Sequence, residues 1–324
     1  MGGAVPGRQR DIFVAIRRKH RDRFSATSAY DPAPLRSPTL LAYPNVSEGR
    51  DRAVIDRIAK AFGPALLDVH SDVDHHRSAY TLAGGPGELA QAVVRGAQQA
   101  VASIRLDDHE GVHPRVGAVD VAPIIYLNEE DRGAAAAEAL VLADSLAIEL
   151  DLPVFLYGIL AGGRTRAQLR RGGPAELQRK IDAGELRPDF GPAKLHPTAG
   201  ATLVAARPPL VAFNVELEPP ATLEDARRIA AHIREGGDEG LAGLRAIGLW
   251  LGETNLAQVS TNVEDHRATP LRAVVEAVAR HAPVRGTELV GLAPEAAFED
   301  FPTHVALRGY ATIEQSLQSR ALTQ

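Results

Sequence analysis

The sequence predicts an α+β protein made of two similar halves, and three observations carry this prediction. From residue 40 onward, short apolar runs alternate with longer segments whose apolar residues recur at helical spacing. Residues 210–215 repeat the pattern of residues 40–46, and a helix-like segment follows in both places. The length of 324 residues is about twice that of an ordinary domain. Two βαββαβ halves with helices packed on one sheet face would be ferredoxin-like domains, although such echoes also arise without duplication.

The elements of the first half follow from the period of the apolar residues. Val54, Ile55, Ile58 and Phe62 fall on one helix face, and Leu89 begins a second amphipathic stretch in which apolar residues recur about every four positions. A glycine-rich break at 84–87 separates this second helix from the strand before it. The predicted strands are 40–43, 65–69, 78–83, 116–127 and 154–157, and the predicted helices are 54–62, 89–104, 134–150 and a basic helix over 164–181 interrupted at 172–173.

The second half repeats strand and helix in the same order. A helix begins at Thr222, where Asp225 completes an acidic capping box, and ends at the glycine pair 236–237. The predicted strands are 210–215, 244–251, 258–262 and 284–292, with a helix opening at 269–270 between the last two. The predicted organisation is an N-terminal arm over 1–38, subdomains over 39–206 and 207–300, and a C-terminal tail over 301–324.

Composition and charge exclude several classes of protein. The chain has no cysteine, which rules out disulfides, thiolate zinc sites and a cysteine nucleophile. The net charge of −5 argues against the basic surface that binds nucleic acids. No apolar run is long enough to span a membrane. The first 38 residues differ, with eight Lys or Arg against three Asp or Glu. We predict a disordered arm there; a targeting segment is the alternative, disfavoured because it has no apolar core.

One match to a metal-binding motif is rejected because of the residues within it and directly after it. Residues 109–113 match H-E-x-x-H, a zinc pattern that requires both histidines on one helix face. Gly111 lies between the two histidines and Pro114 follows directly, which pushes His113 out of the helical region. We therefore expect no metal site here.

Polar residues gather between two predicted strands. His70, His75 and His76 lie beside acidic residues, which allows either a metal site or a solvated loop, and the loop is favoured. Arg77 begins a strand, where a fixed guanidinium could bind a carboxylate. His113 lies in a glycine-flanked loop between helix and strand and could act as a general base or acid, although a lone loop histidine is more often structural.

Two further features lie near the predicted domain boundary. Proline and glycine constrain a long loop over 188–200, which is either a connector or a ligand clamp between domains. Arginines 164, 166, 170 and 171 form either a solvated helix face or an anchor for an anionic ligand. The chain has neither a P-loop nor a G-x-S-x-G motif.

Six blocks of residues occur in a fixed order along the chain. They are 44–50, 113–118 with Asp120 and Val121, 153–157, 188–192, 257–262 and 286–292. Through these blocks the chain is similar to glutamate formimidoyltransferase over about residues 40 to 297, and the resemblance implies two similar ferredoxin-like subdomains with a ligand cleft between them. About 27 residues follow residue 297, too few for the cyclodeaminase domain fused to the animal enzymes, so we expect a stand-alone transferase module.

The resemblance also implies a reaction and a site. The family transfers a formimino group from N-formimidoyl-L-glutamate to tetrahydrofolate in histidine breakdown, giving 5-formimidoyltetrahydrofolate and L-glutamate. His113 matches the family's catalytic histidine. For the substrate we expect Asp68 or Asp74 to orient the cationic amidine, and Arg77 and Arg115 to bind the glutamate carboxylates. The folate-binding loop matches Gly191, Pro192, Ala193, Lys194, Leu195, His196, Pro197, Thr198, Ala199 and Gly200.

Other functions stay open at this point. Formyl transfer between folate and glutamate would use the same histidine with a neutral donor, and a non-catalytic folate-binding module would not need the intact His113. A nucleic-acid binder is disfavoured because aromatic residues make up only 5% of the chain. We expect tetrahydrofolate as co-substrate, no metal, no nucleic-acid or membrane partner, a homodimer and a cytoplasmic location.

Overall fold

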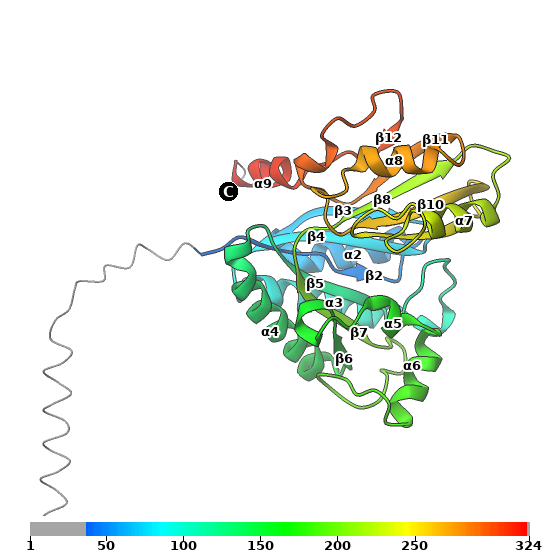
Figure 1. The fold of residues 1–324 in the computed structure, drawn as a ribbon. Coiled ribbons are helices and arrows are strands. Elements are labelled where there is room, and N and C mark those ends of the chain that lie inside the picture. The colour runs from blue at the N-terminus through cyan, green and yellow to red at the C-terminus, as the bar shows by residue number, and fades with distance from the viewer. Residues whose placement is uncertain (1–36, 323–324) are drawn as a thin grey trace, which may run out of the picture. The chain divides into compact units, whose positions relative to one another are not determined.

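The computed structural model describes residues 37–322 and gives an α+β fold with two mixed sheets (Figure 1). The predicted N-terminal arm lies almost entirely outside these residues. The α+β class predicted from the sequence is confirmed. The limits set for the subdomains and for the tail stay predictions.

The first sheet follows the order β3, β4, β1 with β2, β5, β7 and β6. β1 and β2 act as one interrupted strand that pairs with β4 on one side and β5 on the other. Pairing is antiparallel from β3 to β5 and parallel from β5 through β7 to β6. The strand bounds are β1 Leu40–Ala42, β2 Asn45–Val46, β3 Leu66–Asp72, β4 Arg77–Gly84, β5 Val119–Tyr126, β6 Val154–Leu156 and β7 Thr202–Arg207.

Three helices cover one face of this sheet: α2 (Arg52–Phe62), α3 (Glu88–Ser103) and α4 (Arg132–Leu150). α2 begins where Asp51 accepts hydrogen bonds from the first free amides, and the residues predicted for its apolar face are all buried. Glu138 of α4 is buried and accepts 2.7 Å hydrogen bonds from the amides of Gly87 and Ala90, which caps α3 from a neighbouring helix. The helices over this core therefore begin at defined residues: α2 at its own N-cap, and α3 at a cap supplied by another helix.

Two features of the first half differ from the sequence prediction. α5 (Arg166–Arg170) and α6 (Gly173–Asp182), separated by the predicted glycine break, pack on the other face of the sheet through Leu169 and Leu177. The helices of this half therefore do not all lie on one face. The strand β7 was also not predicted from the sequence. Both of its faces are buried, so its residues do not alternate between apolar and polar.

The second sheet has the order β12, β11, β8, β10 and β9, antiparallel except for the pair β11–β12. α7 (Leu223–Ile233) and α8 (Leu271–Ala279) cover one face, and the predicted capping box of Thr222 and Asp225 begins α7. The order strand, helix, strand, strand, helix, strand is the same as from β1 to β5. The strand bounds are β8 Val211–Leu217, β9 Leu244–Leu251, β10 Leu256–Val263, β11 Val284–Val290 and β12 Leu307–Arg308.

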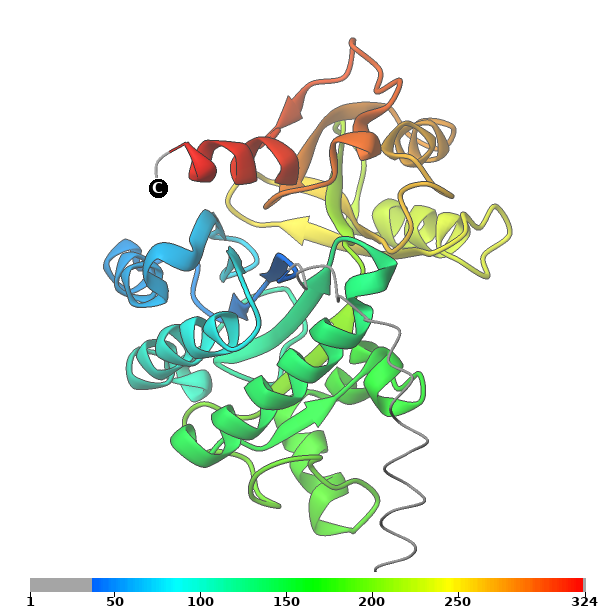
Figure 2. The same cartoon turned by 90° about the vertical axis from the view of Figure 1, so that its left-hand side faces the viewer.

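The two sheets face each other, with α2, α3 and α4 on the outer face of the first and α7 and α8 on the outer face of the second, as the two ribbon views show (Figures 1 and 2). A small apolar cluster that includes Leu41, Ile125 and Leu292 joins them, and the Tyr43 hydroxyl donates a 2.8 Å hydrogen bond to the carbonyl of Val290. α9 (Ile313–Ala321) adds to this cluster and was not predicted. No helix among residues 37–322 is long and apolar enough to cross a membrane.

Candidate active site

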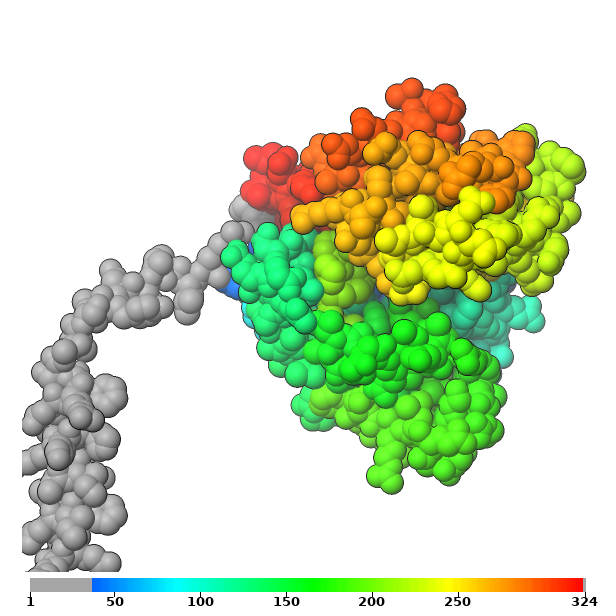
Figure 3. Space-filling view, in the orientation of Figure 1, coloured from blue at the N-terminus to red at the C-terminus, as the bar shows by residue number. Residues whose placement is uncertain are grey.

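A large cavity lies between the two halves of the described structure. Its volume is about 1290 Å³, above the ~300–1,000 Å³ usual for a pocket that holds one small ligand. One wall comes from β9 and β10, and the other from the loop over 111–115 together with α5 and the end of β7. In the space-filling view, the surface is hollowed between the green residues of the first half and the yellow residues of the second (Figure 3). The space is sufficient for two small substrates together.

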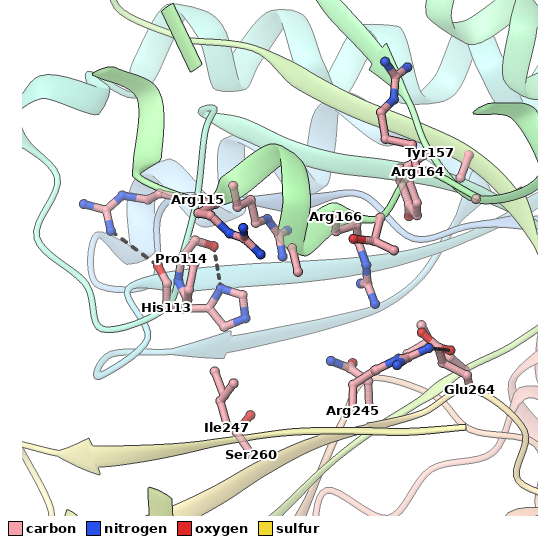
Figure 4. Close-up of a pocket in the computed structure, with 18 of the residues that line it drawn as sticks. His113, Pro114, Arg115, Tyr157, Arg164, Arg166, Arg245, Ile247, Ser260 and Glu264 are labelled. Atoms are coloured by element: carbon pink, nitrogen blue, oxygen red, sulfur yellow. Dashed lines mark hydrogen bonds and ion pairs between the residues drawn. The ribbon is translucent and has the colours of Figure 1, made fainter. Parts of the chain in front are cut away.

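His113 reaches this cavity from an irregular loop. Residues 109–115 contain no helix, so the H-E-x-x-H match does not have the geometry of a helical zinc motif. His109 instead stacks on His76 with ring centroids 4.1 Å apart, and its Nε2 lies 2.8 Å from the carbonyl of His76. No three His, Asp or Glu side chains within 37–322 are grouped to hold a metal. His113 itself points toward Ile247 and Ser260 across the cavity (Figure 4).

The contacts of His113 determine its protonation state. Its Nδ1 lies 2.8 Å from the carbonyl oxygen of Pro114 and 3.3 Å from Nη1 of Arg77. Because a carbonyl only accepts, the shorter contact requires a proton on Nδ1, which leaves the lone pair on Nε2. Burial, followed by the positive charges of Arg77 and Arg170, lowers the pKa of His113 well below its ordinary value. At neutral pH His113 is therefore a neutral imidazole with a free basic nitrogen.

A buried carboxylate organises the cations behind His113. Asp120 has no exposed surface, accepts hydrogen bonds from Arg77 at 2.8 Å and from Arg170, and accepts a third from the amide of Val116 at 2.8 Å. Burial alone would raise the pKa of Asp120, but Arg170 and Arg77 outweigh it and hold the pKa well below its ordinary range. This carboxylate therefore stays ionised and neutralises one of the two guanidiniums.

The cavity wall is strongly cationic. The described part of the chain shows no acidic partner for Arg166, Arg171 or Arg234, whereas Arg245 pairs with Glu235 and Glu264. The guanidinium of Arg166 lies 5.8 Å from the ring centre of Tyr157 and extends into the open space (Figure 4). Such a wall favours ligands that carry carboxylates or phosphates. The arginines lining it are 115, 164, 166, 170, 171, 207, 234 and 245.

The predicted substrate-binding residues are only partly brought together. Arg115 lines the cavity, but its guanidinium donates to the carbonyls of Gly111 and His109 and so braces the loop. Arg77 lies behind His113, and its Nε and Nη1 are engaged within the protein, by Asn45 at 2.9 Å and by Asp120. Neither Asp68 nor Asp74 lines the cavity.

Asp68 and Asp74 have other surroundings. Asp68 lies on β3, where burial raises its pKa. Oδ1 of Asp74 accepts a 2.9 Å hydrogen bond from the amide of Glu253, in the turn between β9 and β10. Asp74 thus links the two halves at the rim of the described fold.

The loop over 191–200 also lies outside the cavity lining. Gly191 and Gly200 have positive φ, and an added Cβ would overlap the carbonyl of Leu152 at the first and of Val116 at the second. His196 accepts hydrogen bonds from the amides of Thr198 and Ala199, which closes the loop on itself. Both glycines therefore serve close backbone packing in this structure.

Sequence reasoning did not assign roles to Asp120, Asp72 and His75. Asp120 was identified only as part of a family motif. An acidic residue in the otherwise apolar run 119–126 is nevertheless a detectable signal of a buried carboxylate that needs a partner. Arg170 was part of the arginine cluster, but nothing in the sequence links it to Asp120, fifty residues away. Only the packing of α5 against β5 and β7 brings the two together.

The fold and the cavity define a class of protein: a two-part α+β protein whose halves enclose a cavity lined with arginines, into which His113 presents a neutral imidazole. Two family models match the chain. The N-terminal subdomain of the formiminotransferase domain matches residues 39–207, and the formiminotransferase domain matches residues 212–314. The chain belongs to the formiminotransferase family, as its motifs indicated.

Individual relatives agree with this. The chain is 36% identical over 269 residues to a glutamate formimidoyltransferase of Streptococcus pyogenes serotype M1, covering 79% of this chain and 89% of that protein. It is 34% identical over 271 residues to that of Thermoplasma acidophilum, covering 79% and 88%. It is 40% identical over 274 residues to a formimidoyltransferase-cyclodeaminase of Sus scrofa, covering 79% of this chain and 50% of that protein. The chain thus spans about half the length of the formimidoyltransferase-cyclodeaminases it matches.

Proposed function

We propose that this protein transfers the formimino group of N-formimidoyl-L-glutamate to tetrahydrofolate, giving 5-formimidoyltetrahydrofolate and L-glutamate. The observation that carries the proposal is the neutral imidazole of His113 facing a cationic cavity large enough for both substrates. The names of the Streptococcus and Thermoplasma relatives support the same reaction.

The reaction has two requirements that the site can meet. Both substrates carry glutamate carboxylates, and Arg166, Arg171 and Arg234 supply guanidiniums that no acidic side chain of residues 37–322 neutralises. The two reacting atoms must also be held about 3 Å apart, which a shared cavity provides. The roles given to Asp68, Asp74, Arg77 and Arg115 in substrate binding stay predictions.

The chemical step moves one proton and exchanges one bond. N5 of the pterin attacks the amidine carbon, so that the N5–C bond forms and the bond from that carbon to the glutamate nitrogen breaks. Nε2 of His113 takes the N5 proton and returns it to the leaving nitrogen, so the protons balance. Between the two transfers, the Pro114 carbonyl and the carboxylate of Asp120 offset part of the destabilisation of the imidazolium by burial, Arg77 and Arg170. A positioned base of this kind contributes roughly 10²–10⁴-fold.

Within the α+β class, we infer that each half is a ferredoxin-like subdomain and that the ligand cleft lies between the two halves. The support is the shared order of elements and the strand order, which is β5-β1-β4-β3 in one half and β11-β8-β10-β9 in the other. Binding of tetrahydrofolate by residues 191–200, a homodimer, a cytoplasmic location and the lack of any metal requirement also stay predictions.

A spectrophotometric assay tests the function. Purified protein is incubated with tetrahydrofolate and either N-formimidoyl-L-glutamate or N-formyl-L-glutamate, and the folate product is converted in acid to its methenyl chromophore. Product from the formimino donor at a rate at least tenfold above that from the formyl donor supports the proposal. The reverse preference would favour formyl transfer, and binding of folate without product from either donor would favour a binding module. Unchanged activity after dialysis against EDTA is expected if no metal is needed.

A further inference from the structure

A second histidine lies next to His113 and is held by its own carboxylate. His75, in the turn between β3 and β4, places Nδ1 3.0 Å from Oδ2 of Asp72, and its backbone amide donates a 2.7 Å hydrogen bond to Oδ1 of the same residue. The side chain of His75 is only 8% exposed. The carboxylate therefore fixes both the ring and the backbone of His75.

This pairing determines how His75 faces Asp72. An ionised carboxylate only accepts, so Nδ1 of His75 carries a proton and donates it to Asp72. Burial would raise the pKa of Asp72, but the hydrogen bond and charge of His75 outweigh it and lower the pKa, which keeps Asp72 ionised. Nε2 of His75 is buried and has no hydrogen-bond partner among residues 37–322. Hydrogen bonds therefore hold the ring of His75 from one side only, through Asp72.

The ring of His75 contacts His113. Their centroids are 6.1 Å apart and their planes meet at 78°, an edge-to-face arrangement. Arg77 and the Pro114 carbonyl contact Nδ1 of His113, and His75 packs against the ring itself. Because His113 lies on a loop with no regular hydrogen-bond ladder, its ring orientation depends on these neighbours.

His75 does not line the cavity, so it does not touch a substrate bound there. We propose that the Asp72–His75 pair is a positioning device for His113, in which Asp72 fixes the ring of His75 and that ring holds the imidazole of His113 with Nε2 directed into the cavity. The proposal rests on the proposed function of His113 as proton carrier. It assigns a role to a buried histidine and a partly buried carboxylate that are otherwise unexplained.

Two variants separate the ring from the hydrogen bond. His75→Asn keeps an N–H near the position of Nδ1 for Asp72 but removes the ring, whereas His75→Phe keeps the ring and removes the N–H. If the ring positions His113, His75→Asn lowers kcat by ~10-fold or more, because small misplacements of a reacting group cost up to ~10²-fold. KM for tetrahydrofolate stays within about threefold, and His75→Phe restores part of kcat.

The chain offers a matched control. His281 places Nε2 3.1 Å from Oε1 of Glu239 and stacks on His232 with ring centroids 5.6 Å apart, so it is also a histidine with a carboxylate and a neighbouring imidazole. It does not line the cavity. His281→Asn is expected to leave kcat, KM and the titration of His113 unchanged.

The deciding measurement is an NMR titration of His113 in the free protein labelled with ¹⁵N-histidine, which needs no donor or folate. The groups that face His113 are Arg77, Arg170, Asp120 and His75, and burial, to which the neighbouring ring of His75 contributes, is the first cause that lowers the pKa of His113. Loss of His75 should therefore move the His113 midpoint to higher pH in His75→Asn, together with the fall in kcat.

Two results would overturn the proposal. One is an unchanged kcat and an unchanged His113 midpoint in His75→Asn. The other is a lower kcat with a lower melting temperature but no change in the His113 midpoint, which would make His75 a structural residue only. If wild-type protein turns over neither donor, the proposed function fails, while the titration still decides whether His75 acts on His113.

Discussion

Nη1 of Arg77 lies 2.8 Å from Oδ2 of Asp120, a carboxylate with no exposed surface. Arg170 donates to the same oxygen, so two guanidiniums share one negative charge. The positive charge that remains faces His113 and disfavours its imidazolium form. Together with burial, which is the larger cause, this charge keeps the imidazole of His113 neutral at physiological pH.

Asp120→Asn should destabilise the protein strongly. The substitution leaves Arg77 and Arg170 buried without a counter-charge, and breaking a buried ion pair in this way costs about 3–5 kcal/mol. Urea denaturation at pH 7 measures the loss in the free energy of unfolding. Asp56→Asn, which breaks an exposed pair with Arg52, should be indistinguishable from wild type.

The contribution of Asp120 to the free energy of unfolding should fall only in strong acid. Its pKa is lowered on folding, so its contribution is fully present above the ordinary carboxyl pKa of about 3.9 and is lost as pH falls through the lowered folded value. The stability difference between wild type and Asp120→Asn should stay constant from pH 8 to 5 and narrow only in stronger acid. A difference that shrinks between pH 7 and 5 would contradict a depressed pKa.

His113→Asn should abolish most turnover while leaving the fold intact. Asparagine keeps part of the hydrogen bonding but cannot exchange a proton near neutral pH, so kcat should fall by ~10²-fold or more with a smaller change in KM. Retention of more than about a tenth of wild-type kcat would remove His113 as proton carrier. His304→Asn, at an exposed histidine outside the cavity, is the control.

The same histidine sets the acidic limb of the rate profile. The neutral form is active and its pKa is lowered well below 6.5, so kcat/KM for wild type should stay level from pH 8 down past 6.5 and fall only at lower pH. An acidic limb at or above 6.5 would mean that the imidazole titrates normally.

Arg166→Ala should weaken binding rather than catalysis. The side chain faces the cavity without an acidic partner in the described structure, and its loss removes a cation available to a substrate carboxylate. We expect KM for tetrahydrofolate to rise by about tenfold with kcat nearly unchanged, which initial rates will show. Arg228→Ala, on the exposed face of α7 where the arginine pairs with Asp225, should change neither.

Lys194→Ala tests whether residues 191–200 bind folate. Lys194 is exposed, so its removal should leave the melting temperature unchanged, unlike a substitution at Gly191, where an added Cβ would meet the Leu152 carbonyl. If the loop binds folate, as the family resemblance predicts, Kd for tetrahydrofolate rises severalfold, measured by fluorescence quenching. An unchanged Kd, with Lys60→Ala as the matched exposed lysine, would remove this loop from the site.

Local sequence determined most of the secondary structure and the position of His113. The apolar period of α2, the capping box at Thr222 and the glycine break before α6 act within a few residues, so they can be detected without the fold. Pro114 likewise excludes a helical zinc motif by a steric effect on the residue before it. Ordered motifs identified the family because each block combines several residue types at fixed spacing.

Tertiary structure alone decided how the site is assembled. Arg77, Asp120 and Arg170 come from β4, β5 and α5, and they meet only because β5 lies next to β7 and α5 packs across the face opposite α2, α3 and α4. The cavity needs β9 and β10 from the second half, and the contact of His75 with His113 needs two loops to fold together. Such contacts join residues tens of positions apart, where chain connectivity imposes no spacing, so no pattern in one sequence encodes them directly.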